Sequence, residues 1–156
     1  MAQDNRQLTI REMEDGEEFA SWLRDLGEAG GDGEGGEGGE GGEGEDAEAS
    51  EERHLVLTDE IGDWIGGLRW SLRGGAAEVR EVAVVPHERG RGHAHRLLAA
   101  FEQRAGEQGA HLLELWTDHE PEEVLLEAQG WRRVIRREGY IGGRTWYLLE
   151  KRLTPA

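Results

Sequence analysis

Residues 82–98 read Val-Ala-Val-Val-Pro-His-Glu-Arg-Gly-Arg-Gly-His-Ala-His-Arg-Leu-Leu, and this stretch decides the fold. An apolar strand runs into Pro86, a basic turn with two glycines follows, and an amphipathic helix comes next. The first backbone N–H groups of a helix have no partner within it, and the helix dipole adds partial positive charge at the same end. The stretch therefore predicts a strand–turn–helix unit with an anion site where the helix begins.

The turn itself supplies groups suited to phosphate. Gly90 and Gly92 lack a Cβ atom, so an anion can approach the main chain and unusual φ values are accessible. Arginine side chains add guanidinium groups whose fork geometry matches phosphate oxygens. The alternative is an ordinary strand-to-helix connection whose arginines are simply solvated. We expect the anion to bind at Arg89, Gly90, Arg91, Gly92, His93 and Ala94.

Residues 89–94 fit the pattern R/Q-x-x-G-x-G/A, which resembles the acyl-CoA-binding motif of the GNAT family of N-acetyltransferases. The resemblance implies acetyl-CoA as the acyl-donor cosubstrate, an amine acceptor, and direct transfer in a ternary complex. It also implies that backbone N–H groups around Val82 and Val84 pair with the pantetheine arm and polarise the thioester carbonyl. The resemblance is specific from Glu78 to Trp131 and rests on the order of elements outside that span.

Hydrophobic periodicity and glycine turns place the other elements. The predicted order is β-α-(disordered loop)-β-β-β-α-β-α-β-β, an α/β fold with a mixed, mostly antiparallel sheet of about seven strands flanked by helices. This resembles the GNAT order, except that a glycine- and glutamate-rich segment replaces the usual second helix. The predicted strands are 7–14, 54–58, 64–72, 77–85, 111–116, 131–138 and 144–152. The predicted helices are 17–26, which ends at Gly27, one from the glycine turn to Gly106 or Gly109, and a short one that begins at Pro121.

Composition bounds the domain and its partners. The chain has 156 residues, which suits a single domain over residues 1–156. Its net charge is −16, and eleven of its acidic residues lie in residues 28–52, which hold no basic residue. We expect 28–52 to be a disordered insertion, because it has no large apolar side chain to bury. The acidic balance argues against nucleic acid as a partner and is compatible with a cationic amine, while a homodimer stays open.

The chain contains no cysteine. A disulfide framework, a thiolate zinc site and an acyl-cysteine intermediate are therefore excluded. The histidine spacing supports no metal site, and the start of the chain lacks the apolar segment of a signal peptide. No run is long and apolar enough to span a bilayer, so we expect no membrane partner and a cytoplasmic protein.

A strand glutamate is the expected general base. Counting back from Pro86 in the family pattern E-L-x-x-L-x-V-x-P places Glu78 at the acidic position. An amine acceptor is mostly ammonium at neutral pH, and a carboxylate can accept its proton directly or through one water. Glu81 lies three residues further on, so strand alternation predicts that it points to the opposite face. Deprotonation through water without Glu78 is the alternative.

The general acid usual in the family is missing. The pattern N-x-x-A-x-x-L-Y-E-x-x-G-F places Leu126 where the tyrosine stands and His119 where the asparagine stands. Leucine cannot donate a proton, so Tyr140 or His119 is the expected substitute, and His119 is also assigned to the cofactor site. A thiolate is a fair leaving group, so loss of the acid need not abolish activity. A catalytically silent acyl-CoA-binding module is the second hypothesis for function.

Six tryptophans are many for this length. Trp64 and Trp70 lie six residues apart on one predicted strand, and hence on one face. With Trp22 of the first helix they either line an acceptor pocket, where aromatic rings beside acidic groups suit a cation, or simply pack in the core. The sequence does not name the acceptor.

Overall fold

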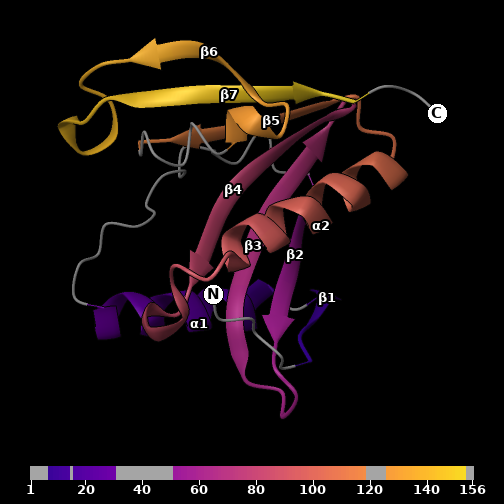
Figure 1. The fold of residues 1–156 in the computed structure, drawn as a ribbon, viewed down its shortest axis with the longest axis vertical. Helices are drawn as coiled ribbons and strands as arrows, with labels where there is room; N and C mark the ends of the chain where they lie inside the picture. The colour runs from indigo at the N-terminus through magenta and orange to yellow at the C-terminus, as the bar shows by residue number, and fades with distance from the viewer. Residues whose placement is uncertain (1–6, 15, 31–50, 119–125, 154–156) are drawn as a thin grey trace.

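The computed structural model describes residues 7–14, 16–30, 51–118 and 126–153, which form one sheet flanked by helices (Figure 1). Its strands lie in the order β1-β2-β3-β4-β5-β7-β6, and this confirms the predicted fold class. The helices are α1 (Gly16–Gly30) and α2 (His93–Glu107), with the 3-10 helices η2 (Pro86–Glu88) and η3 (Ile141–Gly143). The strands are β1 (Thr9–Met13), β2 (Glu51–Thr58), β3 (Trp64–Arg73), β4 (Ala76–Val84), β5 (Leu112–Thr117), β6 (Arg132–Arg137) and β7 (Trp146–Arg152).

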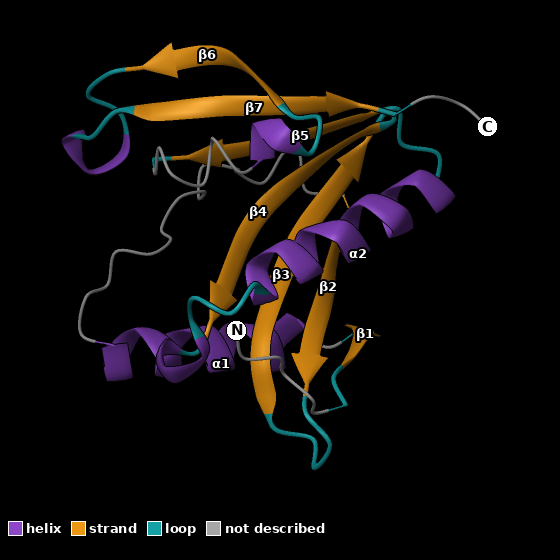
Figure 2. Ribbon diagram, viewed as in Figure 1, coloured by secondary structure: helices purple, strands orange, loops and turns teal. Residues whose placement is uncertain are grey.

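Among the described strand pairs, only β4 and β5 run parallel. A parallel pair needs a crossover, and α2 supplies it on one face of the sheet. Figure 2 shows the result: β2, β3 and β4 form one half of the sheet, and β5, β7 and β6 form a second half that turns away from the first. The two halves meet at one end of β4 and β5.

Two adjacent glycines of β3 mark the two faces of the sheet. A Cβ atom on Gly66 would lie 3.2 Å from Leu97 of α2, whereas a Cβ atom on Gly67 would lie 2.7 Å from Phe19 of α1. Because successive residues of a strand point to opposite faces, α1 and α2 cover opposite faces. We call these the α1 face and the α2 face. Both helices approach the sheet so closely at this point that only glycine fits without a shift of the neighbours.

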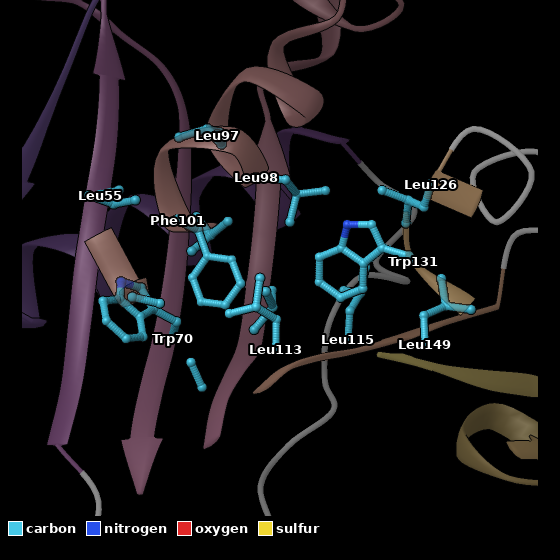
Figure 3. Packing of buried hydrophobic residues seen from close by; sticks show 14 of the residues in the cluster. Leu55, Trp70, Leu97, Leu98, Phe101, Leu113, Leu115, Leu126, Trp131 and Leu149 are labelled. Atoms are coloured by element: carbon cyan, nitrogen blue, oxygen red, sulfur yellow. The ribbon is translucent and has the colours of Figure 1, made fainter. Parts of the chain in front are cut away.

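The main hydrophobic core lies on the α2 face (Figure 3). The rings of Trp70 in β3 and Phe101 in α2 pack edge to face with centroids 5.3 Å apart, and both side chains are fully buried. The apolar stripe predicted for α2 is thus the surface that it buries. Leu126, from a helical turn at 126–128, and Trp131 extend this core under the second half of the sheet.

A β-bulge in β4 changes which carboxylates share a face. Arg69 pairs with Glu81 and Trp70 pairs with Val79, so Arg80 is an extra residue in β4. One extra residue reverses the alternation of side chains beyond it. Glu78, which pairs with Ser71, and Glu81 therefore both lie on the α1 face. The prediction that these two glutamates point to opposite faces is wrong.

A second bulge lies at the start of β3. Leu57 pairs with Gly66 and Thr58 pairs with Trp64, so Ile65 is the extra residue. Trp64 consequently lies on the α1 face, where its ring centroid is 5.4 Å from that of Trp22. Trp70 lies on the α2 face, so the prediction that Trp64 and Trp70 share a face is also wrong.

The predicted boundaries of the acidic insertion also need correction. Helix α1 continues past Gly27 to Gly30, and β2 begins at Glu51 rather than at His54. The two ends of the predicted insertion, residues 28–30 and 51–52, therefore belong to regular elements. Residues 31–50, the remainder of the insertion, lie outside the described residues, as does the start of the helix predicted at Pro121.

The contact between α2 and β3 makes a stability prediction. Phe101→Ala removes a fully buried ring from its packing against Trp70. We expect the free energy of unfolding to fall by about 3–5 kcal/mol, measured by urea denaturation. Gln103→Ala, at an exposed position of the same helix, is the control and should change it by less than about 0.5 kcal/mol. Equal effects of the two substitutions would contradict this account of the core.

Candidate active site

The site is organised by the point at which β4 and β5 part. Their ladder has only three pairs, Ala76 with Leu112, Ala77 with Leu113 and Glu78 with Glu114. Beyond Glu78, β4 continues to Val84, and Figure 1 shows β5 diverging from it. Residues 79–84 of β4 therefore have a strand partner on the side of β3 and none on the side of β5 among the described strands.

This arrangement directs particular backbone groups toward β5. The Val85 amide donates a hydrogen bond of 2.9 Å to the carbonyl of Ile65. Because amide directions alternate along an antiparallel strand, the amides of Val84 and Val82 point away from β3. The carbonyl of Val84 points the same way, since it accepts a hydrogen bond of 3.0 Å from Nε of Arg89. The amides of Val82 and Val84 thus lie on the edge of β4 that faces β5, in the part of β4 that no longer pairs with it.

The glycine turn lies directly after this edge. Val84 is followed by η2, and both Gly90 and Gly92 have positive φ, of 79° and 86°. Gly92 is the N-cap of α2, and no described side chain caps the helix there. A Cβ atom on either glycine would meet no described atom within 4 Å. The turn therefore presents the amides at the start of α2 beside open space, which is the geometry expected for an anion site.

A cluster of polar contacts around Glu88 holds the turn against α2. Glu88 and His93 are buried, and Nε2 of His93 lies 3.1 Å from Oε1 of Glu88. Arg91 donates a hydrogen bond of 3.3 Å to the same oxygen. His93 therefore points into the protein, and only its backbone N–H remains to serve the predicted anion site. Glu88 was not predicted from the sequence, because a glutamate in a basic turn reads as an exposed residue.

A second feature of the site is a row of carboxylates. Glu78 is the last residue of β4 that pairs with β5, and its partner Glu114 pairs in turn with Glu150 of β7. Leu113 and Leu115 belong to the core on the α2 face, so Glu114 points to the α1 face. We call Glu78, Glu114 and Glu150 the acidic ladder.

Glu114 pairs with Glu78 on one side and with Glu150 on the other, so it is the middle residue of the ladder. Its pKa is raised above the usual range, first by burial and then by the negative charges of Glu78 and Glu150, with Arg73 opposing. Glu150 has nearby cations, since Arg132 lies 3.3 Å and Arg152 3.6 Å from its Oε2 atom. The sequence analysis missed Glu114. The alternation of apolar and polar residues in β5 predicts an exposed carboxylate at Glu114. Its neighbours Glu78 and Glu150 become known only when the order of the strands is known.

The α1 face also carries Glu81. Its Oε1 atom accepts a hydrogen bond of 3.0 Å from Nη2 of Arg69, an ion pair in which both side chains are mostly buried. Glu78 has a longer contact of 3.5 Å with Arg80 and is the one of the two that borders β5. The geometry thus keeps Glu78, and not Glu81, at the point where the strands part.

Tyr140 lies on the same face, beyond the ladder. Its ring centroid is 5.3 Å from that of Trp116 and 6.4 Å from that of Trp146, and the guanidinium carbon of Arg137 lies 4.3 Å from the ring centre. Trp116 follows Glu114 by two residues in β5, so both point to the α1 face. Leu126, at the position of the family's tyrosine, is buried in the core on the other face. His119 lies outside the described residues.

Two further observations concern the described residues alone. No three histidine, aspartate or glutamate side chains among them gather closely enough to hold a metal ion. The described helices include none with the length and apolar character needed to cross a membrane.

Comparisons with known proteins point the same way as the geometry. The model of the acetyltransferase (GNAT) family matches residues 11–126, and no curated protein matches the chain. The ribosomal-protein-S18-alanine N-acetyltransferase from Escherichia coli is 18% identical, with a TM-score of 0.71 over 96% of each chain. The IAA acetyltransferase from Bacillus cereus is 17% identical, with a TM-score of 0.68 over 94% of this chain and 100% of that one. Nourseothricin acetyltransferase is 20% identical, with a TM-score of 0.58 over 66% of each chain. At these identities, the structural likeness shows the fold alone.

The acidic ladder makes a prediction about stability and pH. The raised pKa of Glu114 means that the folded protein holds this proton more tightly than the unfolded chain does. Its contribution to stability is therefore fully present below the ordinary glutamate pKa of about 4.3 and is lost as the pH rises above it. We expect Glu114→Gln to raise the melting temperature relative to the natural chain progressively from pH 4 toward neutral pH.

Glu107→Gln is the control, because Glu107 is an exposed residue at the end of α2, away from the ladder. Thermal unfolding of the three proteins across the pH range checks the prediction. A melting difference for Glu114→Gln that is independent of pH would contradict it.

Proposed function

Because the chain belongs to the acetyltransferase (GNAT) family, we propose that it transfers an acetyl group from acetyl-CoA to a primary amine. The amine attacks directly while both substrates are bound, since the chain has no cysteine to carry the acyl group. The observation that carries this proposal is the parting of β4 and β5 immediately beyond Glu78 and Glu114. Backbone amides with no strand partner among the described residues, a pair of carboxylates and the glycine turn therefore all lie on or next to β4.

The residues at the turn fit the diphosphate of coenzyme A. Gly90 and Gly92 leave open space beside the first amides of α2, and the helix dipole favours an anion there. Arg89 is exposed, and its Nε atom is anchored on the carbonyl of Val84. We assign donor binding to Arg89, Gly90, Arg91, Gly92, His93 and Ala94, with His93 acting through its backbone. His119 stays assigned to the same site as a prediction.

The edge of β4 fits the remainder of the donor. The amides of Val82 and Val84 point toward β5 and have no strand partner there among the described residues. They can donate hydrogen bonds to the carbonyl groups of an extended chain laid along the strand. Acetyl-CoA supplies a thioester carbonyl, and an N–H group aimed at its oxygen stabilises the negative charge that develops there.

Glu78 and Glu114 act on the acceptor. Two adjacent carboxylates attract an ammonium ion, and transfer of its proton to one of them relieves their mutual repulsion. The pKa of Glu114 is raised first by burial and then by the negative charges of Glu78 and Glu150. A carboxylate with a raised pKa is a better proton acceptor near neutral pH. We assign the general base to Glu78, because it is the last residue of β4 that pairs with β5. It acts directly or through one water, and Glu114 beside it supplies the second carboxylate.

Tyr140 is the proposed proton donor to the departing thiolate. It lies on the same face as Glu114, in contact with Trp116 at the end of β5. We expect Tyr140 to contribute little to the rate, because the thiol of coenzyme A has a pKa of about 8.5 and its thiolate can leave without full protonation. This explains how Leu126, buried in the core, can occupy the position of the usual acid.

Glu78→Gln tests the role of the base. We expect the rate of thiol release from acetyl-CoA, measured with a panel of primary amines, to fall by about 100-fold or more. The affinity for acetyl-CoA should stay within about twofold, because Glu78 lies outside the turn that grips the diphosphate. Glu107→Gln again serves as the control and should leave both quantities unchanged.

The same assay separates the two hypotheses for function. Tight binding of acetyl-CoA with no thiol release for any amine would overturn the enzymatic proposal in favour of a silent acyl-CoA-binding module. Unchanged release in Glu78→Gln would instead overturn the assignment of the base.

The glycine turn gives a prediction about donor affinity. Gly92→Glu places a carboxylate where the diphosphate is proposed to bind, so calorimetry should detect no binding of acetyl-CoA. Gly109→Glu is a matched control, because Gly109 also has positive φ, of 94°, and open space around its Cβ position. Both variants introduce the same backbone strain and the same negative charge. They differ in position, because Gly92 lies at the start of α2 and Gly109 lies just beyond its end. Loss of affinity in both, or in neither, would contradict the assignment of the turn.

A further inference from the structure

A cavity of about 600 Å³ lies on the α1 face, away from the acidic ladder. Its walls come from α1, from the turn between β2 and β3, and from the end of β4 with η2. Val85, which lines it, is seven residues beyond Glu78, about 20 Å along an extended strand. The cavity is therefore away from the proposed site of proton transfer at Glu78. It adjoins the glycine turn through Glu88, which lines it and also contacts His93.

Two tryptophans form an aromatic wall of this cavity. Trp22 of α1 and Trp64 of β3 both line it, with ring centroids 5.4 Å apart and planes inclined at 56°. Phe19 packs behind both rings, 5.8 Å from Trp22 and 6.4 Å from Trp64. The bulge at Ile65 is what turns Trp64 to this face. Indole faces attract cations and also cover methylene groups well.

The charged groups around the tryptophans are almost all acidic. Among the described lining residues there is no lysine or arginine, and His87 is the one basic side chain. Asp25 lies on α1 and Asp63 at the end of the β2–β3 turn, so the two carboxylates enter from different elements. Asp59, beside them, is committed to the turn, since its Oδ1 atom accepts from the amides of Ile61 and Asp63. A concave surface of one sign of charge concentrates ions of the opposite sign.

The origin of these carboxylates on two different elements favours an elongated organic cation over a metal ion. No three acidic or histidine side chains in the described part of the chain converge as metal ligands do. Carboxylates that come from separate elements suit a ligand with more than one positive charge. Tryptophan rings lining the same cavity suit the methylene groups that join those charges.

We propose that this cavity binds a linear aliphatic polyammonium ion. Its methylene chain lies on Trp22 and Trp64, and its ammonium groups are held by Asp25 and Asp63. Binding of this ion does not require acetyl transfer. The proposal can therefore be tested independently of the proposed enzymatic activity.

Spermidine is the probe, and the indole N–H signals of the tryptophans in a proton–nitrogen correlation spectrum are the readout. This readout is local, whereas a bulk measurement would also register cations attracted to the eleven acids of residues 28–52. We expect saturable shifts of the Trp22 and Trp64 signals, with much smaller shifts for Trp116 and Trp146 of the second half of the sheet. Equal shifts for all four, or none, would overturn the proposal.

Asp25→Asn with Asp63→Asn tests the assigned contacts. We expect this double variant to weaken the spermidine affinity read at Trp22 and Trp64 by tenfold or more. Glu107→Gln with Glu138→Gln removes the same charge from exposed positions elsewhere and should change that affinity by less than twofold. Thermal unfolding establishes that both doubles are folded, and single aspartate variants replace the first double if it is not. Equal weakening in the two doubles, or magnesium chloride shifting the same signals at the same concentration as spermidine, would overturn the proposal.

Discussion

The pairing of β4 with β5 stops after three residue pairs, and most of the proposed site follows from that limit. A backbone amide without a partner is unfavourable unless water or a ligand satisfies it. Along the edge of β4 beyond Glu78, the amides of Val82 and Val84 have no strand partner among the described residues. The carbonyl of Val84 on the same edge accepts a hydrogen bond from Arg89. An extended molecule with its own amide and carbonyl groups satisfies this edge as a strand would. The parallel pairing of β4 with β5 therefore has two consequences. It leaves an edge of β4 open for binding, and its last residue pair places Glu78 beside Glu114.

The order of elements could be predicted from the sequence because its signals are local. The alternation of strands, the apolar stripe of α2 and the glycine turns each depend on residues within a few positions of one another. The faces of particular side chains could not be predicted in the same way. The bulges at Ile65 and Arg80 appear only when neighbouring strands are aligned, and each one reverses the alternation beyond it. Counting along the chain therefore misplaced Trp64 relative to Trp70 and Glu81 relative to Glu78.

The candidate site shows the same division between local and distant information. The positive φ of Gly90 and Gly92 could be predicted because it depends only on the turn that contains them. Glu114 was missed because its raised pKa arises from burial and from carboxylates on two other strands. Glu88 was missed because its burial and its contacts with Arg91 and His93 arise only when the turn folds against α2. What a residue faces in space is settled by strand order and by close packing, and a single sequence without its pairing partners does not contain that information.

The charge of the chain sets different conditions for the two proposed substrates. A net charge of −16 attracts a cationic acceptor from a distance and repels an anionic donor. At physiological ionic strength, however, such interactions between exposed charges are largely screened beyond about 8 Å. In the proposed complex, binding of the donor diphosphate then depends on groups in direct contact, namely the amides at the start of α2 and the guanidinium groups of the turn. Their short-range attraction has to exceed the remaining repulsion, and amides fixed by a helix supply it without side-chain reorganisation.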